Sequence, residues 1–181
     1  MKILMITGSL RKGSFNRQLA QKAAELLNGK AEVAYLDYAD LPYMNQDLES
    51  PVPAAVARVR SEVLAADGLW FFSPEYNPSY TGVLKNLLDW LSRPLEAGNY
   101  ASGTAIAGRK TAISGAAGKS GAGYSRERLR ELLVQIKAEV LPEETGVVLG
   151  AECWKSDQLV LTDDDLAQLQ KQAEAFLAFL R

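Results

Sequence analysis

Short, uninterrupted runs of apolar residues are the feature that most constrains how this chain can fold. The runs at residues 2–7, 68–72 and 110–113 show little alternation of polar and apolar positions. Such runs are typical of strands that are buried on both faces of a parallel sheet. Between them, apolar residues recur three and four positions apart, which predicts helices. Strands that alternate with helices predict a parallel sheet between two layers of helices, joined by right-handed crossovers.

Turn and cap signals place the ends of the predicted elements. We expect strands at residues 2–7, 33–36, 68–72, 110–113 and around 147–149, and helices at 14–27, 54–66, 80–91, about 124–136 and from 162 onward. The segment 40–53 holds three of the seven prolines and is expected to be irregular, as is the stretch 92–108. No linker interrupts this pattern, so we expect residues 1–181 to form one domain.

Composition narrows the classes of function. The 181 residues carry a formal net charge of −2, so no overall positive field favours a nucleic acid or an anionic membrane. A single cysteine, Cys153, excludes an internal disulfide and fits a reducing compartment, so we expect a cytoplasmic location. No stretch approaches membrane-spanning length, so we expect no membrane insertion. The chain has no histidine, which removes the usual general base and the commonest metal ligand. We therefore predict no catalytic side chain and no metal site, but a cofactor that supplies the chemistry.

The first candidate site is the loop at residues 8–16, which joins a predicted buried strand directly to the start of a helix. Free N–H groups at a helix N-terminus attract phosphate. Ser9, Ser14 and Asn16 add short donors, and Arg11 can neutralise a dianion. The alternative interpretation is ordinary helix capping by the same residues.

Other nucleotide-binding loops fail on spacing. In the first loop, Ser14-Phe15 stands where a Walker A motif requires Lys followed by Ser or Thr. The later run Gly118-Lys119-Ser120 lacks the first glycine of that motif, because Ile113 occupies its position. No G-x-G-x-x-G follows the first strand, which disfavours the two-half dinucleotide-binding fold.

The second candidate site is the loop after the third predicted strand, which begins Ser73-Pro74-Glu75-Tyr76-Asn77-Pro78. Prolines at both ends stiffen this loop. Tyr76 offers an aromatic face and Asn77 both a donor and an acceptor, a combination that suits a flat heterocycle.

Together, G-S-x-R-x-x-S-x-N at residues 8–16, P-E-Y-N at 74–77 and L-K-N-x-x-D-W at 84–90 resemble the NADPH-dependent FMN reductase family. This family includes bacterial quinone, chromate and azo-dye reductases, and the resemblance covers nearly the whole chain. It implies an α/β flavodoxin-like three-layer sandwich whose five-stranded parallel sheet has the order 2-1-3-4-5. It also implies FMN as cofactor, NADPH or NADH as co-substrate, a small-molecule electron acceptor, and a homodimer or homotetramer.

Carried over residue by residue, the resemblance implies three groups of cofactor-binding residues. The FMN phosphate would be held by Ser9, Arg11, Ser14, Phe15 and Asn16. The ring and ribityl chain would be bordered by Pro74, Glu75, Tyr76 and Asn77, and the other edge of the ring by Ser114, Gly115 and Ala116. Lys85, Asn86, Asp89 and Trp90 also belong to the family signature, but we interpret them as helix and interface structure.

Several further residues invite a functional interpretation that we do not favour. Arg126, Arg128 and Arg130 follow the third loop and are more simply a solvated helix face than a contact to a nicotinamide phosphate. Cys153-Trp154 has no base to activate the thiol, so we predict a packing or surface role. The acidic residues 163–165 fit the first turn of a helix better than a metal site.

Two rival functions share the same fold. A flavodoxin-type carrier would pass single electrons between protein partners, and such a carrier is expected to show a strongly acidic docking face, for which a net charge of −2 gives little sign. A non-catalytic interaction module would use the irregular segment 40–53 as a partner surface. That segment, with Tyr43 and Met44, is also our predicted surface for contact with a second copy.

Overall fold

The computed structural model describes residues 1–181, and its centre is a five-stranded parallel sheet. The strands are β1 (Lys2–Thr7), β2 (Glu32–Tyr35), β3 (Gly68–Phe72), β6 (Lys110–Ala117) and β7 (Glu139–Val148). Their order across the sheet is β2-β1-β3-β6-β7, and every neighbouring pair is parallel. The predicted order 2-1-3-4-5 is therefore confirmed.

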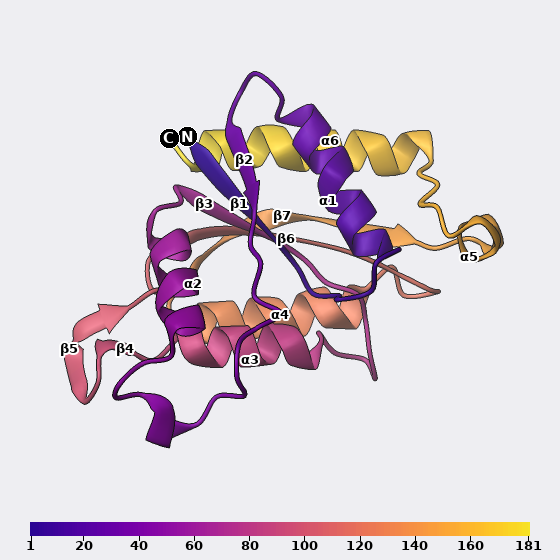
Figure 1. The fold of residues 1–181 in the computed structure, drawn as a ribbon. Coiled ribbons are helices and arrows are strands. Elements are labelled where there is room, and N and C mark those ends of the chain that lie inside the picture. Colours follow the sequence, from indigo (N-terminus) through magenta and orange to yellow (C-terminus); the bar gives the residue numbers. More distant parts are fainter.

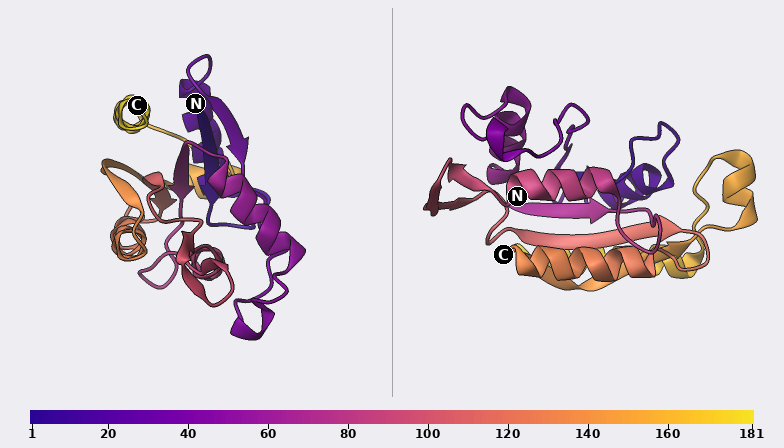
Figure 2. Two further views of the ribbon diagram at one scale, coloured as in Figure 1. Left: turned by 90° about the vertical axis from the view of Figure 1, so that its left-hand side faces the viewer. Right: turned by 90° about the horizontal axis from the view of Figure 1, so that it is seen from below.

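Helices cover both faces of the sheet (Figure 1). They are α1 (Phe15–Leu26), α2 (Ala54–Leu64), α3 (Gly82–Leu91), α4 (Gly123–Gln135), α5 (Ala151–Ser156) and α6 (Asp163–Phe179), with a short 3-10 helix at Gln46–Leu48. The helices α1 and α6 lie on one face, and α2, α3 and α4 lie on the other (Figures 1 and 2). None of these helices is long and apolar enough to cross a membrane.

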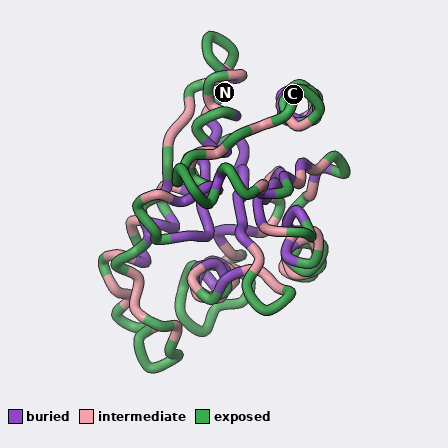
Figure 3. The backbone as a smooth tube through the Cα atoms, turned by 90° about the vertical axis from the view of Figure 1, so that its right-hand side faces the viewer, coloured by how far each residue is buried: buried purple, intermediate pink, exposed green.

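Two hydrophobic clusters, one on each face, hold the layers together. The strand β3 is fully buried and supplies both of them: Trp70 and Phe72 pack toward α1 and α6, while Leu69 and Phe71 pack toward the opposite helices. Side chains alternate across a strand, so burial on both faces requires an apolar residue at every position. Figure 3 shows the buried strands surrounded by exposed loops.

The structure differs from the sequence prediction where pairing partners lie far along the chain. The stretch 92–108, expected to be loose, contains an antiparallel hairpin of β4 (Pro94–Glu96) and β5 (Asn99–Thr104). The strand β6 does not end near residue 113 but runs to Ala117, because β7 pairs with it along that length. Small residues that look like a loop in sequence thus become strand when a neighbour supplies the hydrogen bonds.

The loops that follow β1, β3 and β6 gather at the carboxyl ends of the strands. The helix α5 lies at this same end of the molecule, and the β4–β5 hairpin projects from the opposite end (Figures 1 and 2). In open parallel sheets, ligands bind beyond the carboxyl ends of the strands, where the strand order reverses. This is the end of the molecule to search for a site.

Candidate functional site

A cavity of about 230 Å³ lies where the three loops meet. Nine of the twelve predicted binding residues line it, and they come from all three loops: Ser9, Arg11, Ser14, Phe15, Asn16, Pro74, Glu75, Tyr76 and Ala116. The other lining residues are Ala117, Gly118, Leu149 and Trp154. We call this space the loop cavity.

The first loop presents a group of hydrogen-bond donors to the loop cavity. Ser14 is the N-cap of α1, and its Oγ accepts a 3.3 Å hydrogen bond from the Arg17 backbone N–H. Ser9 Oγ likewise accepts from the Arg11 backbone N–H at 3.3 Å. Both hydroxyl groups retain their own proton as a donor, and the first turn of a helix has N–H groups without intrahelical acceptors. This arrangement suits a phosphate group.

Arg11 supplies the positive charge of the loop cavity. Its Nη1 lies 2.7 Å from the Asp157 carboxylate, and its Nη2 donates to the Gly13 carbonyl. The guanidinium carbon also lies 5.1 Å from the centre of the Phe15 ring. About half of the Arg11 side chain is exposed, so donors remain on the solvent side.

Asn16 makes its side-chain hydrogen bonds within the fold. Its side chain is buried, its Nδ2 donates to the Ala116 carbonyl, and its Oδ1 accepts from the Ala116 N–H, both at 2.9 Å. The pairing of β6 with β3 ends at Ser114, so the Asn16 amide takes the place of a strand partner for Ala116. The side chain thus joins the first loop to the third, and its polar atoms are already bonded within the fold.

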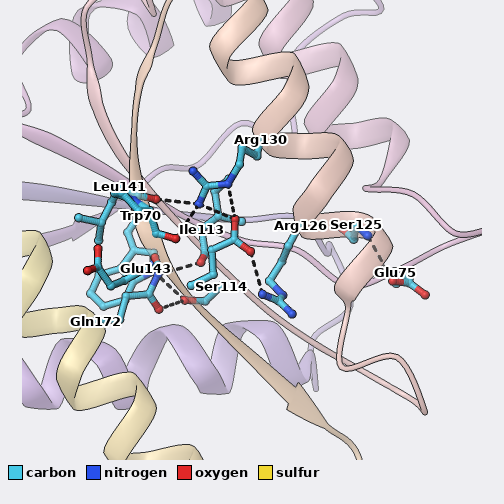
Figure 4. A network of polar contacts seen from close by, with 12 residues as sticks. Trp70, Glu75, Ile113, Ser114, Ser125, Arg126, Arg130, Leu141, Glu143 and Gln172 are labelled. Carbon is cyan, nitrogen blue, oxygen red and sulfur yellow. Dashed lines mark hydrogen bonds and ion pairs between the residues drawn. The ribbon is translucent and has the colours of Figure 1, made fainter.

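Glu75 joins the second loop to the start of α4 (Figure 4). One carboxylate oxygen accepts from Ser120 Oγ at 2.7 Å, and the other accepts from the Ser125 N–H at 3.2 Å. A carboxylate at a helix N-terminus is favourable because it faces unpaired N–H groups and the positive end of the helix dipole. The exposed ring of Tyr76 is left as the aromatic surface of this loop. Asn77 adopts a left-handed φ of 49° and does not line the loop cavity.

Two of the residues predicted for the third loop lie inside the fold instead. Ser114 is fully buried, and its Oγ accepts from Trp70 Nε1 at 2.9 Å and donates to Gln172 Oε1 at 2.8 Å (Figure 4). Gly115 packs so closely that a Cβ there would lie 2.6 Å from the Ser73 carbonyl oxygen. This side of the loop cavity is formed by Ala116 and Ala117, the last two residues of β6, and by Gly118, which follows the strand.

Trp154 is a wall residue that the sequence did not reveal. Its ring meets Phe15 edge to face, with centroids 5.1 Å apart, yet 61% of the residue is exposed. Cys153, the neighbouring residue, is fully buried, which fits the packing role among the two roles predicted for it. Only the position of α5 at the carboxyl end of the sheet brings Trp154 to the loop cavity, so no local sequence signal could have found it.

A larger cavity of about 670 Å³ adjoins the first and shares Ser9, Arg11 and Tyr76 with it. Tyrosines 38, 43 and 76 line it, together with Leu41, Val83 and Asn86. The Tyr38 hydroxyl donates a 2.6 Å hydrogen bond to the Thr7 carbonyl, and burial raises the pKa of this hydroxyl above its ordinary value. We call this space the tyrosine cavity.

Comparison with known proteins identifies the family of this chain. Residues 1–151 match the model of the family described as NADPH-dependent FMN reductase. The chain belongs to this family.

Individual relatives extend the similarity over the whole chain. An NAD(P)H-dependent FMN reductase of Pseudomonas aeruginosa is 36% identical over 184 residues, which cover 100% of this chain and 96% of the relative. A quinone reductase of Escherichia coli (strain K12) is 32% identical over 187 residues, with 100% and 96% coverage. The family and the class of enzyme predicted from the motifs are thereby confirmed.

Solved structures confirm the predicted fold. The flavoenzyme NAD(P)H:(acceptor) oxidoreductase FerB of Paracoccus denitrificans superposes with a TM-score of 0.85 at 30% identity, and the match covers 99% of this chain and 96% of that one. A flavodoxin from the domain Archaea superposes with a TM-score of 0.64 at 14% identity, with 99% of each chain covered. The second match shows the flavodoxin-like fold alone.

The helix signature of this reductase family has a structural explanation here. Asn86 Oδ1 accepts from the Met44 N–H at 2.8 Å, and its Nδ2 donates to the Pro42 carbonyl at 3.0 Å. Trp90 Nε1 donates to the same carbonyl at 2.8 Å, while Lys85 and Asp89 pair with each other on the helix surface at 2.7 Å. Asn86 and Trp90 thus hold the irregular segment around residue 42 against α3, which agrees with our interpretation of these residues as structural.

Two of the arginines on α4 form ion pairs. Arg126 and Arg130 both contact Glu144 on β7, at 2.8 and 2.6 Å, in a partly buried network (Figure 4). They are thus neither a fully solvated face nor free cations, whereas Arg128 is exposed. The acidic residues 163–165 form the first turn of α6, where Asp165 and Thr162 make a reciprocal capping box, as expected for a helix start. No group of three or more His, Cys, Asp or Glu side chains is arranged to hold a metal ion.

Proposed function

We propose that the protein binds FMN across the loop and tyrosine cavities and uses it to pass electrons from NADPH or NADH to a small acceptor. The observation that carries the proposal is that nine residues predicted from three separate loops line one cavity. The names of the relatives support the two halves of the reaction, since one is an NAD(P)H-dependent FMN reductase and another a quinone reductase.

The donor set of the first loop fits the phosphate end of FMN. Ser9 and Ser14 bring hydroxyl donors, Arg11 brings a positive charge, and α1 brings its N-terminal N–H groups. Asn16 acts on this set indirectly, because its side chain fixes the first turn of α1 against β6. We propose that Asn16 contacts the phosphate through its backbone N–H only.

The rest of the cofactor requires a flat space beside this phosphate site. The shared residues Ser9, Arg11 and Tyr76 make the two cavities continuous, and Tyr76 offers an exposed aromatic face at their junction. FMN, when bound, supplies the electron-transfer chemistry, so the chain needs no histidine and no nucleophile of its own. The contribution of the protein is to hold the three loops rigidly, through the Asn16 and Glu75 hydrogen bonds.

We infer the class of electron acceptor and the oligomeric state from the tyrosine cavity and its mouth. The tyrosine cavity is lined by three aromatic rings and suits a planar acceptor such as a quinone, and we include flavins, azo compounds and chromate as candidates. Large apolar side chains stand exposed at its mouth, with Tyr43 at 88% and Leu10 at 55%. We propose that a second copy of the chain covers this mouth in a homodimer or homotetramer, and that the enzyme acts in the cytoplasm. A mass by light scattering that stays monomeric at high concentration would refute the assembly.

The experiment is a visible absorption spectrum after FMN addition and gel filtration, followed by anaerobic NADPH or NADH and then a quinone. We expect retained flavin absorbance that bleaches with a nicotinamide and returns with the quinone. Retained flavin that responds to neither nicotinamide would favour the one-electron carrier instead. Absence of retained flavin, together with no binding at equilibrium, would refute the site.

The matched variant is Arg11→Ala, with Lys30→Ala as control. Loss of charge-assisted bonds to phosphate should weaken FMN binding by about 1.5–3 kcal/mol. Lys30 is exposed beyond the far end of α1, so its removal should leave FMN affinity unchanged. An Arg11→Ala variant that binds FMN as tightly as the Lys30→Ala control would remove Arg11 from the site.

A further inference from the structure

The segment Ala151–Asp157, made of α5 and the residue after it, packs against the first loop although it lies far away in sequence. Gln18 of α1 holds its end through the backbone: Nε2 donates to the Asp157 carbonyl at 3.1 Å, and Oε1 accepts from the Leu159 N–H at 2.7 Å. Trp154 adds the edge-to-face contact with Phe15. The family match ends at residue 151, so every residue of this segment after Ala151 lies beyond the matched residues.

The segment places a carboxylate directly on the proposed phosphate loop. Asp157 Oδ1 lies 2.7 Å from Arg11 Nη1. The other oxygen, Oδ2, lies against Gly13, where even an added Cβ would collide with it. A negative charge therefore lies against Arg11 and Gly13, beside the groups that we assign to the FMN phosphate.

We propose that Asp157 is an affinity-determining residue that competes with the flavin phosphate for Arg11. The inference rests on the proposed function. A phosphate dianion that approaches this loop meets the Asp157 carboxylate and must either share Arg11 with it or displace it from Arg11, which weakens FMN binding. The phosphate then adds less to flavin affinity than it would with an unpaired arginine, and FMN exchanges more readily.

Two features of the structure favour competition over a supporting role for Asp157. Its side chain is 54% exposed and that of Arg11 is 49% exposed, and ion pairs at this exposure are weak enough for a dianion to break. Gln18 holds the segment through backbone atoms of Asp157 and Leu159, so the carboxylate can turn away without releasing α5.

The test compares Asp157→Asn with wild type for two ligands, FMN and riboflavin, which lacks the phosphate. Asparagine suits the position because Asp157 has a left-handed φ of 58°, which asparagine tolerates. Dissociation constants come from quenching of flavin fluorescence at equilibrium. We expect FMN to bind more tightly to the variant, on the order of tenfold, and riboflavin to bind equally to both proteins.

The control is Asp164→Asn, which removes an exposed carboxylate from the first turn of α6. It should leave both affinities unchanged. Unchanged or weaker FMN binding by Asp157→Asn would overturn the inference, because Asp157 would then be neutral or would support Arg11. An equal gain for riboflavin would also overturn it, since the effect would not depend on the phosphate. If wild type and both variants bind neither flavin, the proposed function itself fails.

Discussion

The hydrogen bonds of Asn16 give the sharpest prediction about how the site is built. Its side chain is 2% exposed and makes two 2.9 Å hydrogen bonds, one to the N–H and one to the carbonyl of Ala116, which is itself 1% exposed. Substitution by alanine removes both bonds and leaves two buried backbone groups without partners. Each orphaned group costs about 1–3 kcal/mol, so we expect Asn16→Ala to lower the free energy of unfolding by about 2–6 kcal/mol.

The assay is urea unfolding followed by far-UV circular dichroism, with no flavin present. The change in midpoint multiplied by the slope gives the loss of stability. Asn28→Ala is the matched control, because Asn28 is exposed after the end of α1 and should change stability by less than about 0.5 kcal/mol. The reasoning is refuted if Asn16→Ala is as stable as the control while its FMN affinity falls, since the side chain would then act on the cofactor rather than on the loops.

Two further perturbations test other parts of the structure. Burial raises the pKa of Tyr38, so the folded protein keeps the hydroxyl proton at a pH where the unfolded chain, with a pKa near 10, has released it. The free energy of unfolding should therefore fall above pH 10 by about 1.4 kcal/mol per pH unit because of this group. Urea unfolding between pH 10 and 12 should show a shallower decline for Tyr38→Phe, and parallel declines would contradict the assignment. A Cβ at Gly146 would lie 2.7 Å from the Gly121 carbonyl oxygen, so Gly146→Ala should destabilise by about 1–3 kcal/mol in thermal or urea unfolding. A Cβ at Gly123, at the start of α4, would meet nothing within 4 Å, so Gly123→Ala should stabilise the folded protein by up to about 1 kcal/mol. Equal losses of stability in both glycine variants would refute the packing argument.

The sequence by itself determined the sheet and most of the loop cavity. A strand such as β3, buried on both faces, must be apolar at each position, and the residues that follow a buried parallel strand must lie at its carboxyl end. Periodicity therefore predicts that Ser9, Ser14 and Pro74 lie at one edge of the sheet, whereas the strand order is what the family resemblance implies. Short-range signals of this kind depend only on neighbours in the chain.

The tertiary structure alone decided which polar atoms at the carboxyl edge of the sheet remain free to bind a ligand. Ser114 looked like a loop residue, yet β7 extends β6 past it and Gln172 of α6 takes its hydroxyl. Asn16 is predicted to contact the phosphate, and the fold uses its side chain to complete the hydrogen bonds of β6 where β3 has ended. Trp154 and Asp157 reach the first loop only because α5 folds over it. Hydrogen bonds and ion pairs form between whichever groups the fold brings within about 3 Å. The partner of each site residue is therefore set by packing between distant segments, which the local pattern does not encode.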